Sequence, residues 1–273
     1  MTTTAVVTGA SSGMGLFASV ELAKRGLDVV ATVRDTLRDT LRAGALLGAA
    51  EQVGVSVQVA ELEVTAPDAA DRLAAIAADH DGIDVLINNA GRGCVGTAED
   101  LTMDEIEAQL AVNYLGPVRL TKAVLPAMRE RGQGRILTVT SVGGVVGQPF
   151  ADAYCGAKFA IEGFMQSLAV VAREVGVWVS VVEPAAVASS FVDNAARTAS
   201  EGPYAALLDA YLARTKVSFA AAQQAADAGR AIADAATSDT YRFRWQTSEA
   251  AERFASISLA DLCLLYTSPS PRD

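Results

Sequence analysis

Histidine and cysteine are scarce in this chain, whose 273 residues include one histidine and three cysteines. Cys94, Cys155 and Cys263 are too far apart for the ligand spacing of a zinc site or for a disulfide framework. His80 lies in a polar Asp-His-Asp-Gly turn, where we expect it to be solvated, and no G-x-S-x-G elbow is present. The sequence therefore predicts neither a Ser-His-Asp hydrolase nor a metal site.

Long apolar runs and excess positive charge are also missing. No uninterrupted apolar run reaches the roughly 18 residues that a membrane span needs. The chain enters a predicted strand at once, without the basic and apolar regions of a signal peptide, so we expect a cytoplasmic protein. There are 22 Lys and Arg against 32 Asp and Glu, a net charge of −10. Such a surface repels phosphate backbones and argues against a nucleic-acid partner.

The composition that remains is globular, with 51% hydrophobic and 20% charged residues in a length that suits one large α/β domain. Short β-branched runs alternate with longer helical stretches. Strands are predicted over residues 4–8, 28–33, 55–60, 84–87, 135–140 and 177–182, with a weak last strand near 241–245. Helices are predicted over residues 14–25, 36–53, 67–79, 102–131, 152–175 and 219–236. Repeated strand–helix–strand units predict a doubly wound parallel sheet with helices on both faces.

The end of the chain differs in composition from the rest. Residues 263–273 read Cys-Leu-Leu-Tyr-Thr-Ser-Pro-Ser-Pro-Arg-Asp, as expected from translating a sequencing-adapter read-through. We therefore expect one domain over residues 1–262 and a non-native tail over 263–273, with the native sequence after about residue 262 missing. A natural Ser/Pro-rich tail is the alternative.

A glycine-rich turn follows the first predicted strand. Residues 8–15 read Thr-Gly-Ala-Ser-Ser-Gly-Met-Gly, with the glycines spaced G-x-x-x-G-x-G before a helix. Glycine accepts positive φ and lets the backbone approach a ligand, while the helix start presents free N–H groups. This position predicts a pyrophosphate site, with an ordinary tight turn as the alternative. The candidate cofactor-binding residues here are Gly9, Ser11, Ser12, Gly13, Met14 and Gly15.

The end of the second predicted strand indicates which dinucleotide is expected. A carboxylate there would bind the ribose 2′-hydroxyl of NAD, but this strand ends without an acid and Arg34 follows. A guanidinium can hold a 2′-phosphate through two hydrogen bonds, to which Ser11 or Ser12 can add a hydroxyl. The pattern favours NADP(H) over NAD(H), although Asp35 is adjacent. A solvated surface charge at Arg34 is the alternative.

Tyr154 and Lys158 are four residues apart in a predicted helix and therefore share a face. A free phenol has a pKa near ~10, which a neighbouring ammonium is expected to lower, so the pair can exchange a proton with a carbonyl oxygen. Ser141 follows the strand predicted over 135–140, at the edge where open α/β sheets bind ligands. Asn113 stands inside a predicted helix, where asparagine is unfavourable, and is a candidate to bind a water next to Lys158.

These segments resemble the short-chain dehydrogenase/reductase family. Residues 8–15 match its T-G-x-x-x-G-x-G motif and residues 88–91 its N-N-A-G motif. Its catalytic tetrad is matched by Asn113, Ser141, Tyr154 and Lys158. The resemblance covers about residues 4–190 and implies a Rossmann fold of about seven parallel strands. It also implies hydride transfer with a nicotinamide cofactor, a ketone or alcohol substrate, and a homodimer or homotetramer packed through two long helices. Further cofactor contacts are implied for Glu63, Asn89, Ala90, Gly91, Tyr154, Lys158, Pro184, Val187 and Ser189.

Residues 31–35, 141–150 and 154–163 resemble the 17β-hydroxysteroid and retinol dehydrogenase branch, which implies NADP(H) and a bulky apolar substrate. The expected substrate region spans about residues 186–220. Its apolar residues either line a pocket or form the ordinary faces of two helices: Phe191, Tyr204, Leu207, Leu208, Tyr211 and Phe219. Two alternatives stay open, a non-catalytic dinucleotide-binding sensor or scaffold and an NAD(H)-preferring enzyme of the same family.

The sequence departs from the family pattern at several positions. Ala185 replaces the glycine after the proline of the sixth strand, so we expect it to adopt a backbone shape usually given to glycine. Glu63 replaces an aspartate, Ser189 replaces a threonine, and residues 156–157 read Gly-Ala where Ala-Ser is usual. None of these changes removes a reacting group.

Overall fold

The computed structural model describes residues 2–35, 40–189, 191, 195–198, 202–220 and 222–260. The tail predicted over 263–273 lies outside the described residues, as do the first residues of the helix predicted over 36–53. Part of the expected substrate region over 186–220 lies outside them as well. Within the described residues, no helix combines the length and the apolar character needed to cross a lipid bilayer.

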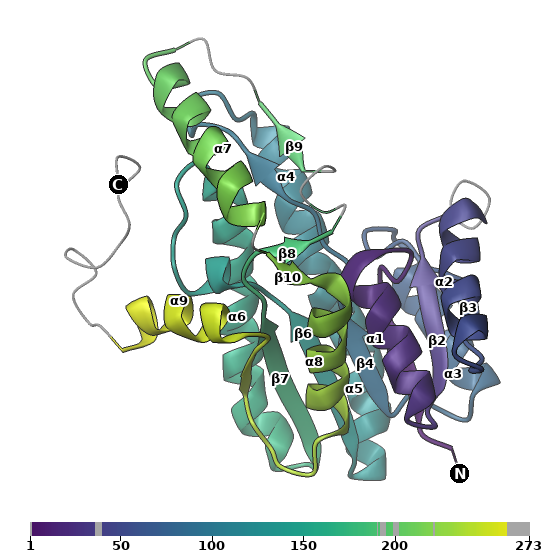
Figure 1. The fold of residues 1–273 in the computed structure, drawn as a ribbon. Coiled ribbons are helices and arrows are strands. Elements are labelled where there is room, and N and C mark those ends of the chain that lie inside the picture. Colours follow the sequence, from purple (N-terminus) through teal and green to yellow (C-terminus); the bar gives the residue numbers. More distant parts are fainter. Residues whose placement is uncertain are drawn as a thin grey trace.

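The predicted doubly wound sheet is confirmed: seven strands, all paired in parallel, run in the order β11-β7-β6-β4-β1-β2-β3 (Figure 1). From one edge to the other they are β11 (Arg244–Gln246), β7 (Val177–Glu183), β6 (Gly134–Val139), β4 (Val85–Asn88), β1 (Thr4–Val7), β2 (Asp28–Val33) and β3 (Gln58–Glu61). The expected weak last strand is therefore present as β11, at the edge of the sheet.

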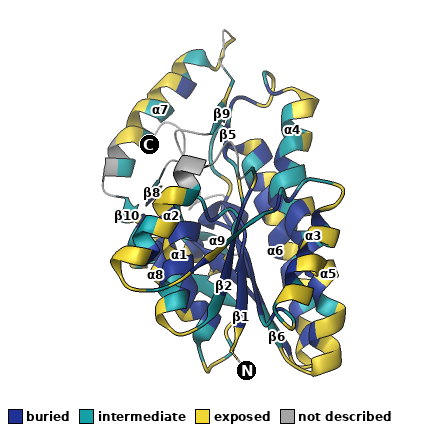
Figure 2. Ribbon diagram, turned by 90° about the vertical axis from the view of Figure 1, so that its right-hand side faces the viewer, coloured by how far each residue is buried: buried dark blue, intermediate teal, exposed yellow. Residues whose placement is uncertain are grey.

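Helices cover both faces because successive strand residues point to opposite sides of the sheet. In β1, Ala5 and Val7 belong to one core cluster and Val6 belongs to the other. The first face is covered by α1 (Gly13–Lys24), α2 (Thr40–Gln52) and α8 (Ala225–Thr237). The second is covered by α3 (Ala69–Asp79), α5 (Gly116–Arg131) and α6 (Asp152–Arg173). Figure 2 shows the buried strands between helices whose outer faces are exposed.

Smaller elements gather beyond the carboxyl ends of the strands, and the sequence did not predict the short strands among them. Two short parallel pairs join distant segments, β5 (Cys94–Val95) with β9 (Ala196–Arg197) and β8 (Val187–Ala188) with β10 (Gln223–Gln224). Around them lie α4 (Met103–Leu110), α7 (Ala205–Ala220) and α9 (Glu249–Leu259), with α7 above the sheet edge in Figure 1.

Two predicted helices are interrupted. The helix predicted over 219–236 is wrong at its start, because α7 ends at Ala220 and α8 begins only at Ala225. Between them, the Gln223 backbone N–H donates to Ala186 O at 3.0 Å and the Gln223 side chain exchanges hydrogen bonds with Thr247. These partners are remote in sequence, so alanine periodicity alone did not reveal the break.

The long helix predicted over 102–131 divides at a π-helical turn over Ala111–Leu115, between α4 and α5.

His80 was expected to be solvated, but its ring is mostly buried. Its Nδ1 lies 2.8 Å from Asp28 Oδ2, at the opposite end of the sheet from the site described below.

Candidate active site

A cavity of about 1160 Å³ opens at the carboxyl ends of the parallel strands, where open α/β sheets bind their ligands. Nine of the predicted site residues line it. They come from the glycine turn, the strand ends and α6: Met14, Asn89, Gly91, Ser141, Tyr154, Lys158, Pro184, Val187 and Ser189. Among these residues, Met14 and Ser189 are 175 positions apart in the sequence, and the fold brings them to the same cavity.

The glycine turn between β1 and α1 is built for close backbone packing. Gly9 and Gly13 adopt φ of 64° and 59°, the left-handed region that favours glycine. A Cβ added at Gly15 would lie 2.3 Å from Asn89 Nδ2 and 2.8 Å from Gly9 O, so a side chain there would displace the turn. Glycine at position 15 is therefore required by packing, and Met14, in the first turn of α1, lines the cavity.

Thr8 and Asn89 tie this turn to the end of β4. Thr8 Oγ1 accepts hydrogen bonds from the backbone N–H groups of Asn89 and Ala90, each at 3.0 Å. In return, Asn89 Nδ2 donates to Thr8 O at 2.8 Å and to Gly9 O at 3.1 Å. The side chain of Asn89 therefore holds the turn in shape, a role that the resemblance did not specify.

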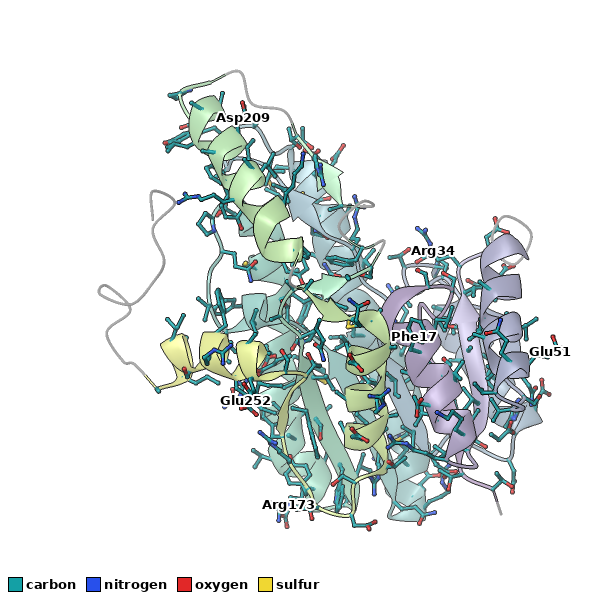
Figure 3. The ribbon with its side chains drawn as sticks, in the orientation of Figure 1. Phe17, Arg34, Glu51, Arg173, Asp209 and Glu252 are labelled. Carbon is teal, nitrogen blue, oxygen red and sulfur yellow. The ribbon has the colours of Figure 1, made fainter. Side chains whose placement is uncertain are left out.

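Arg34 and Glu63 lie away from the cavity, at the ends of β2 and β3. Arg34 directly follows Val33 and is exposed, and it extends into solvent at the edge of the sheet where α1 begins (Figure 3). Glu63 Oε1 accepts hydrogen bonds from Thr65 N at 3.0 Å and Thr65 Oγ1 at 2.9 Å. Both residues are thus on the β2–β3 side of the glycine turn, opposite Tyr154.

Ser141 and Tyr154 form the polar centre of the cavity. Ser141 follows β6, and its Oγ accepts a hydrogen bond from Gly143 N at 2.9 Å. Burial raises the pKa of Tyr154 to about 12, and a hydrogen bond with Ser141 opposes that rise. The phenol ring packs edge-on against Phe191, with 6.0 Å between ring centroids. Tyr154 is therefore a neutral phenol near pH 7.

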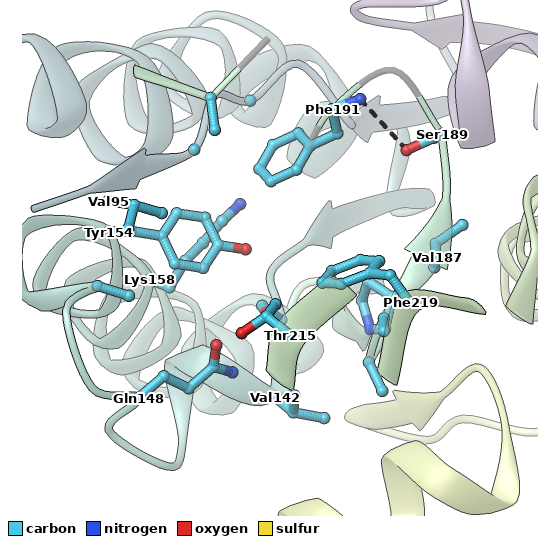
Figure 4. A pocket seen from close by; sticks show the side chains of 18 of the residues that line it. Val95, Val142, Gln148, Tyr154, Lys158, Val187, Ser189, Phe191, Thr215 and Phe219 are labelled. Atoms are coloured by element: carbon cyan, nitrogen blue, oxygen red, sulfur yellow. Dashed lines mark hydrogen bonds between the residues drawn. The ribbon is translucent and has the colours of Figure 1, made fainter. Parts of the chain in front are cut away.

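Lys158 lies beside Tyr154, one turn further along α6 (Figure 4). Its Nζ is 5.9 Å from the centroid of the phenol ring and donates to Val139 O at 2.9 Å. Burial lowers the pKa of Lys158 to about 8, and the carboxylate of Glu162 opposes that change. The pKa of Tyr154 was expected to be lowered, but in this structure it is raised, because burial of the phenol has the larger effect.

Asn113 lies behind the cavity wall, buried in the π-helical turn. Its Nδ2 donates to Arg92 O at 2.8 Å and its Oδ1 accepts from Arg92 N at 3.1 Å. A Cβ added at Gly91 would meet both Asn113 Oδ1, at 3.1 Å, and Lys158 Nζ, at 3.8 Å. Asn113 and Lys158 thus flank the same glycine. Asn113 is the buried residue of this π turn, and turns of this kind occur frequently at functional sites.

The segment that follows β7 forms the cavity wall next to the glycine turn. The Cβ that Gly13 lacks would lie 3.3 Å from Ser189 Cβ, so this segment contacts the glycine turn. Ala185 was expected to need a backbone shape usual for glycine, and this is wrong. Among the described non-glycine residues, positive φ is found at Asp81 and Phe150. Alanine at position 185 therefore imposes no strain of that kind.

Sequence reasoning did not single out several residues that line the same cavity. Figure 4 shows Gln148 and Thr215 on the side of Tyr154 away from Phe191. Tyr211, Leu212, Thr215 and Phe219 share one face of α7, and this spacing was the signal available in the sequence. Two interpretations were left open for the apolar residues of 186–220, a pocket lining or ordinary helix faces. Phe191, Tyr211 and Phe219 line the pocket, whereas Tyr204 is exposed.

Comparison with known proteins places these motifs in a family. The short-chain dehydrogenase model matches residues 3–200. Human retinol dehydrogenase 8 is 41% identical over 193 residues, covering 69% of this chain and 60% of that protein. Mouse 17β-hydroxysteroid dehydrogenase type 1 is 41% identical over 196 residues, covering 70% of this chain and 56% of that protein. The matched region thus spans less than two thirds of the length of these relatives.

Solved structures give the same answer over more of the chain. A short-chain dehydrogenase from Streptomyces avermitilis superposes with a TM-score of 0.80 at 30% identity, covering 95% of this chain and 92% of that one. A metagenomic short-chain oxidoreductase in complex with NADP has a TM-score of 0.62 at 33% identity, covering 67% of this chain and 81% of that one. Since the family model alone matches well over half of the residues, this chain belongs to the short-chain dehydrogenase/reductase family, and its curated relatives include a retinol dehydrogenase and a 17β-hydroxysteroid dehydrogenase.

Proposed function

We propose that this protein is an NADP(H)-dependent oxidoreductase that transfers a hydride between the nicotinamide and a carbonyl or secondary alcohol. The observation that carries the proposal is the position of Tyr154 and Lys158 in the wall of one cavity, whose other walls include Met14 and Ser189 beside the glycine turn. Proton transfer and cofactor binding then meet in one place, as hydride transfer to a carbonyl requires.

The residues around the glycine turn suit a dinucleotide. Gly15 has no room for a side chain, and the N-terminus of α1 offers N–H groups and a positive dipole end to a pyrophosphate. Arg34 supplies a charge for a 2′-phosphate. When bound, the nicotinamide supplies or accepts the hydride. The residues proposed to hold the cofactor are Gly9, Ser11, Ser12, Gly13, Met14, Gly15, Arg34, Glu63, Asn89, Ala90, Gly91, Tyr154, Lys158, Pro184, Val187 and Ser189.

Tyr154 is proposed to donate the proton during carbonyl reduction. Its raised pKa keeps the phenol protonated, and Ser141 can hold the same carbonyl oxygen. As hydride reaches carbon, negative charge develops on that oxygen, and the Lys158 ammonium favours the phenolate that proton transfer leaves behind. Asn113 is proposed to assist Lys158 from behind Gly91, where the two side chains flank the same backbone.

A bulky apolar ketone or alcohol is the proposed substrate class. Much of the cavity around Tyr154 is lined by apolar and aromatic side chains: Val95, Pro149, Phe191, Tyr211, Leu212, Phe219 and Phe254. The names of the two curated relatives, a retinol and a hydroxysteroid dehydrogenase, refer to ligands of that shape. A non-catalytic dinucleotide sensor is the competing reading, but it gives no reason for a buried phenol beside a buried ammonium.

The test is NADPH oxidation by the full chain with cyclohexanone, 2-decalone, a steroid ketone and retinal. We expect Tyr154→Phe to lower kcat by about 10²–10⁴-fold and to change the Kd for NADPH far less, because the ring stays in place and only the hydroxyl that donates the proton is removed. Tyr204→Phe, at an exposed tyrosine, serves as the control. Full turnover in Tyr154→Phe contradicts the assignment, and NADPH binding without turnover of any carbonyl favours the sensor.

A further inference from the structure

A buried ion cluster lies between α6 and the strands β7 and β11. The mechanism proposed above assigns no role to its carboxylates or to its arginine. Glu162 follows Lys158 by one turn of α6, and its side chain is 5% exposed. Its Oε2 accepts a hydrogen bond from Arg244 Nη1 at 2.6 Å. Arg244 also donates to Glu183 at the end of β7, whose other oxygen accepts from Gln246 Nε2 at 2.7 Å. Arg244 and Gln246 come from β11, beyond the residues that the family model matches.

The other oxygen of Glu162 contacts the strand end that carries Ser141. Thr140 Oγ1 donates to Glu162 Oε1 at 2.5 Å. Thr140 stands between Val139, whose carbonyl accepts from Lys158 Nζ at 2.9 Å, and Ser141. Both oxygens of Glu162 are therefore occupied, and the carboxylate links the helix of Lys158 to the strand that orients Lys158 and Ser141. The Glu162 carboxylate therefore restrains the position of α6 relative to the end of β6 and also places a negative charge near Lys158.

We propose that Glu162 is a positioning residue for Lys158: clamped by Arg244 and Thr140, its carboxylate keeps the ammonium charged and directed at Val139 O beside Tyr154. Opposite charges in a buried environment favour each other's ionised forms. The effect on catalysis rests on the proposed function. The ionisation itself is a property of the protein and can be measured without substrate.

The cluster is balanced in charge. Among the described residues, the charged groups facing Glu162 are Lys158 on its own helix, Glu183 on β7 and Arg244 on β11. When they and Glu162 are all ionised, the four groups carry two positive and two negative charges. Burial raises the pKa of Glu162 from 4.5 to about 7, while the hydrogen bond from Thr140 and the charge of Arg244 lower it and that of Glu183 raises it. Glu162 therefore changes charge near neutral pH.

The first test is a pH series without cofactor or substrate. A pKa raised from 4.5 to about 7 means that the native state binds more protons in this range, so the stability from Glu162 is complete below pH 4.5. It is lost as the pH rises through about 7. Lys158, with its pKa lowered from 10.5 to about 8, acts in a separate window, where stability rises from pH 8 to 10.5.

Urea unfolding of the full chain between pH 4.5 and 7.5 measures this difference. We expect the free energy of unfolding to fall across the window in wild type, and the profile of Glu162→Gln to be flatter. The matched control is Glu249→Gln, because Glu249 also pairs with an arginine, Arg253 at 3.6 Å, but both side chains are exposed. Its profile should parallel that of wild type. Parallel profiles for all three proteins overturn the proposal.

The second test is the pH dependence of kcat for NADPH oxidation with 2-decalone. Wild type should lose activity above about pH 8 as Lys158 loses its proton. The midpoint of this loss should move down by about one pH unit in Glu162→Gln, because the carboxylate that favours the ammonium is gone. Arg244→Gln should shift it in the same direction, since Glu162 then holds its proton to higher pH. Arg244→Lys should restore it.

These variants keep the outcomes distinct. An unchanged midpoint in Glu162→Gln overturns the proposal. If Glu162→Gln does not fold, Arg244→Gln and Arg244→Lys make the same comparison, and equal midpoints in that pair overturn it. If wild type turns over no carbonyl while the unfolding profiles differ as expected, the proposed function fails and the ionisation of Glu162 stands.

Discussion

At the scale of the residue, charge and burial carry different parts of the chemistry. Arg34 is exposed, so its charge is available to a phosphate. Tyr154 and Lys158 are the opposite case, since burial raises the pKa of the first and lowers the pKa of the second. The sequence identified all three side chains, but burial is a property of packing and reversed the expected direction for Tyr154.

Replacing Arg34 tests the cofactor preference. We expect Arg34→Ala to weaken NADPH binding by roughly 10- to 100-fold, because a charge-assisted pair with a phosphate contributes about 1.5–3 kcal/mol. NADH lacks that phosphate, so its Kd should not change. Fluorescence titration of both cofactors measures this, with Arg129→Ala, an exposed arginine on α5, as the control. Equal losses for both cofactors would contradict the proposed role.

At the scale of the element, strand–helix alternation predicted a doubly wound parallel sheet, but contacts between elements set the helix ends. The π turn at Ala111–Leu115 and the break before α8 depend on partners remote in sequence. Helix α8 packs closely on α1, and Gly229 makes this possible. A Cβ added there would lie 2.6 Å from Phe17 Cβ and 2.8 Å from Ala18 N. No periodicity in the sequence distinguishes this glycine from one at a helix surface.

Two glycine-to-alanine changes separate packing from helix propensity. We expect Gly229→Ala to destabilise the protein by about 1–3 kcal/mol, because the helices must move apart. Gly44→Ala, on α2, meets nothing within 4 Å and should stabilise it by up to about 1 kcal/mol through helix propensity alone. Urea unfolding measures both. Equal and favourable changes would mean that α1 and α8 do not pack this closely.

At the scale of the whole molecule, one exposed apolar surface stands out on the second face. Phe159, Val170 and Val171 on α6 are 46%, 70% and 62% exposed. We propose that this surface of α6 contacts a second copy of the chain, in line with the homodimer or homotetramer that the family resemblance implies. Burying such side chains between subunits would remove apolar area from water.

Charge introduced on this surface tests the assembly. We expect Val170→Glu combined with Val171→Glu to reduce the molecular mass in solution, measured by light scattering after size exclusion, because a buried unpaired charge is costly. Val53→Glu, at a 49% exposed valine that follows α2, should leave the mass unchanged. A monomeric wild type, or an unchanged mass in the double variant, excludes this interface.

The sequence by itself determined the parallel sheet and the glycine turn, because periodicity and glycine placement are local properties of the chain. Motifs shared with a known family singled out Asn113, Ser141, Tyr154 and Lys158. Tertiary structure decided the rest. The cavity wall from α7, the clamp of Asn89 on the turn and the cluster around Glu162 join residues that are far apart in the sequence; Arg244 and Glu162, for example, are 82 positions apart. Ionisation and cavity shape depend on which groups surround a side chain in space, and no local pattern records that.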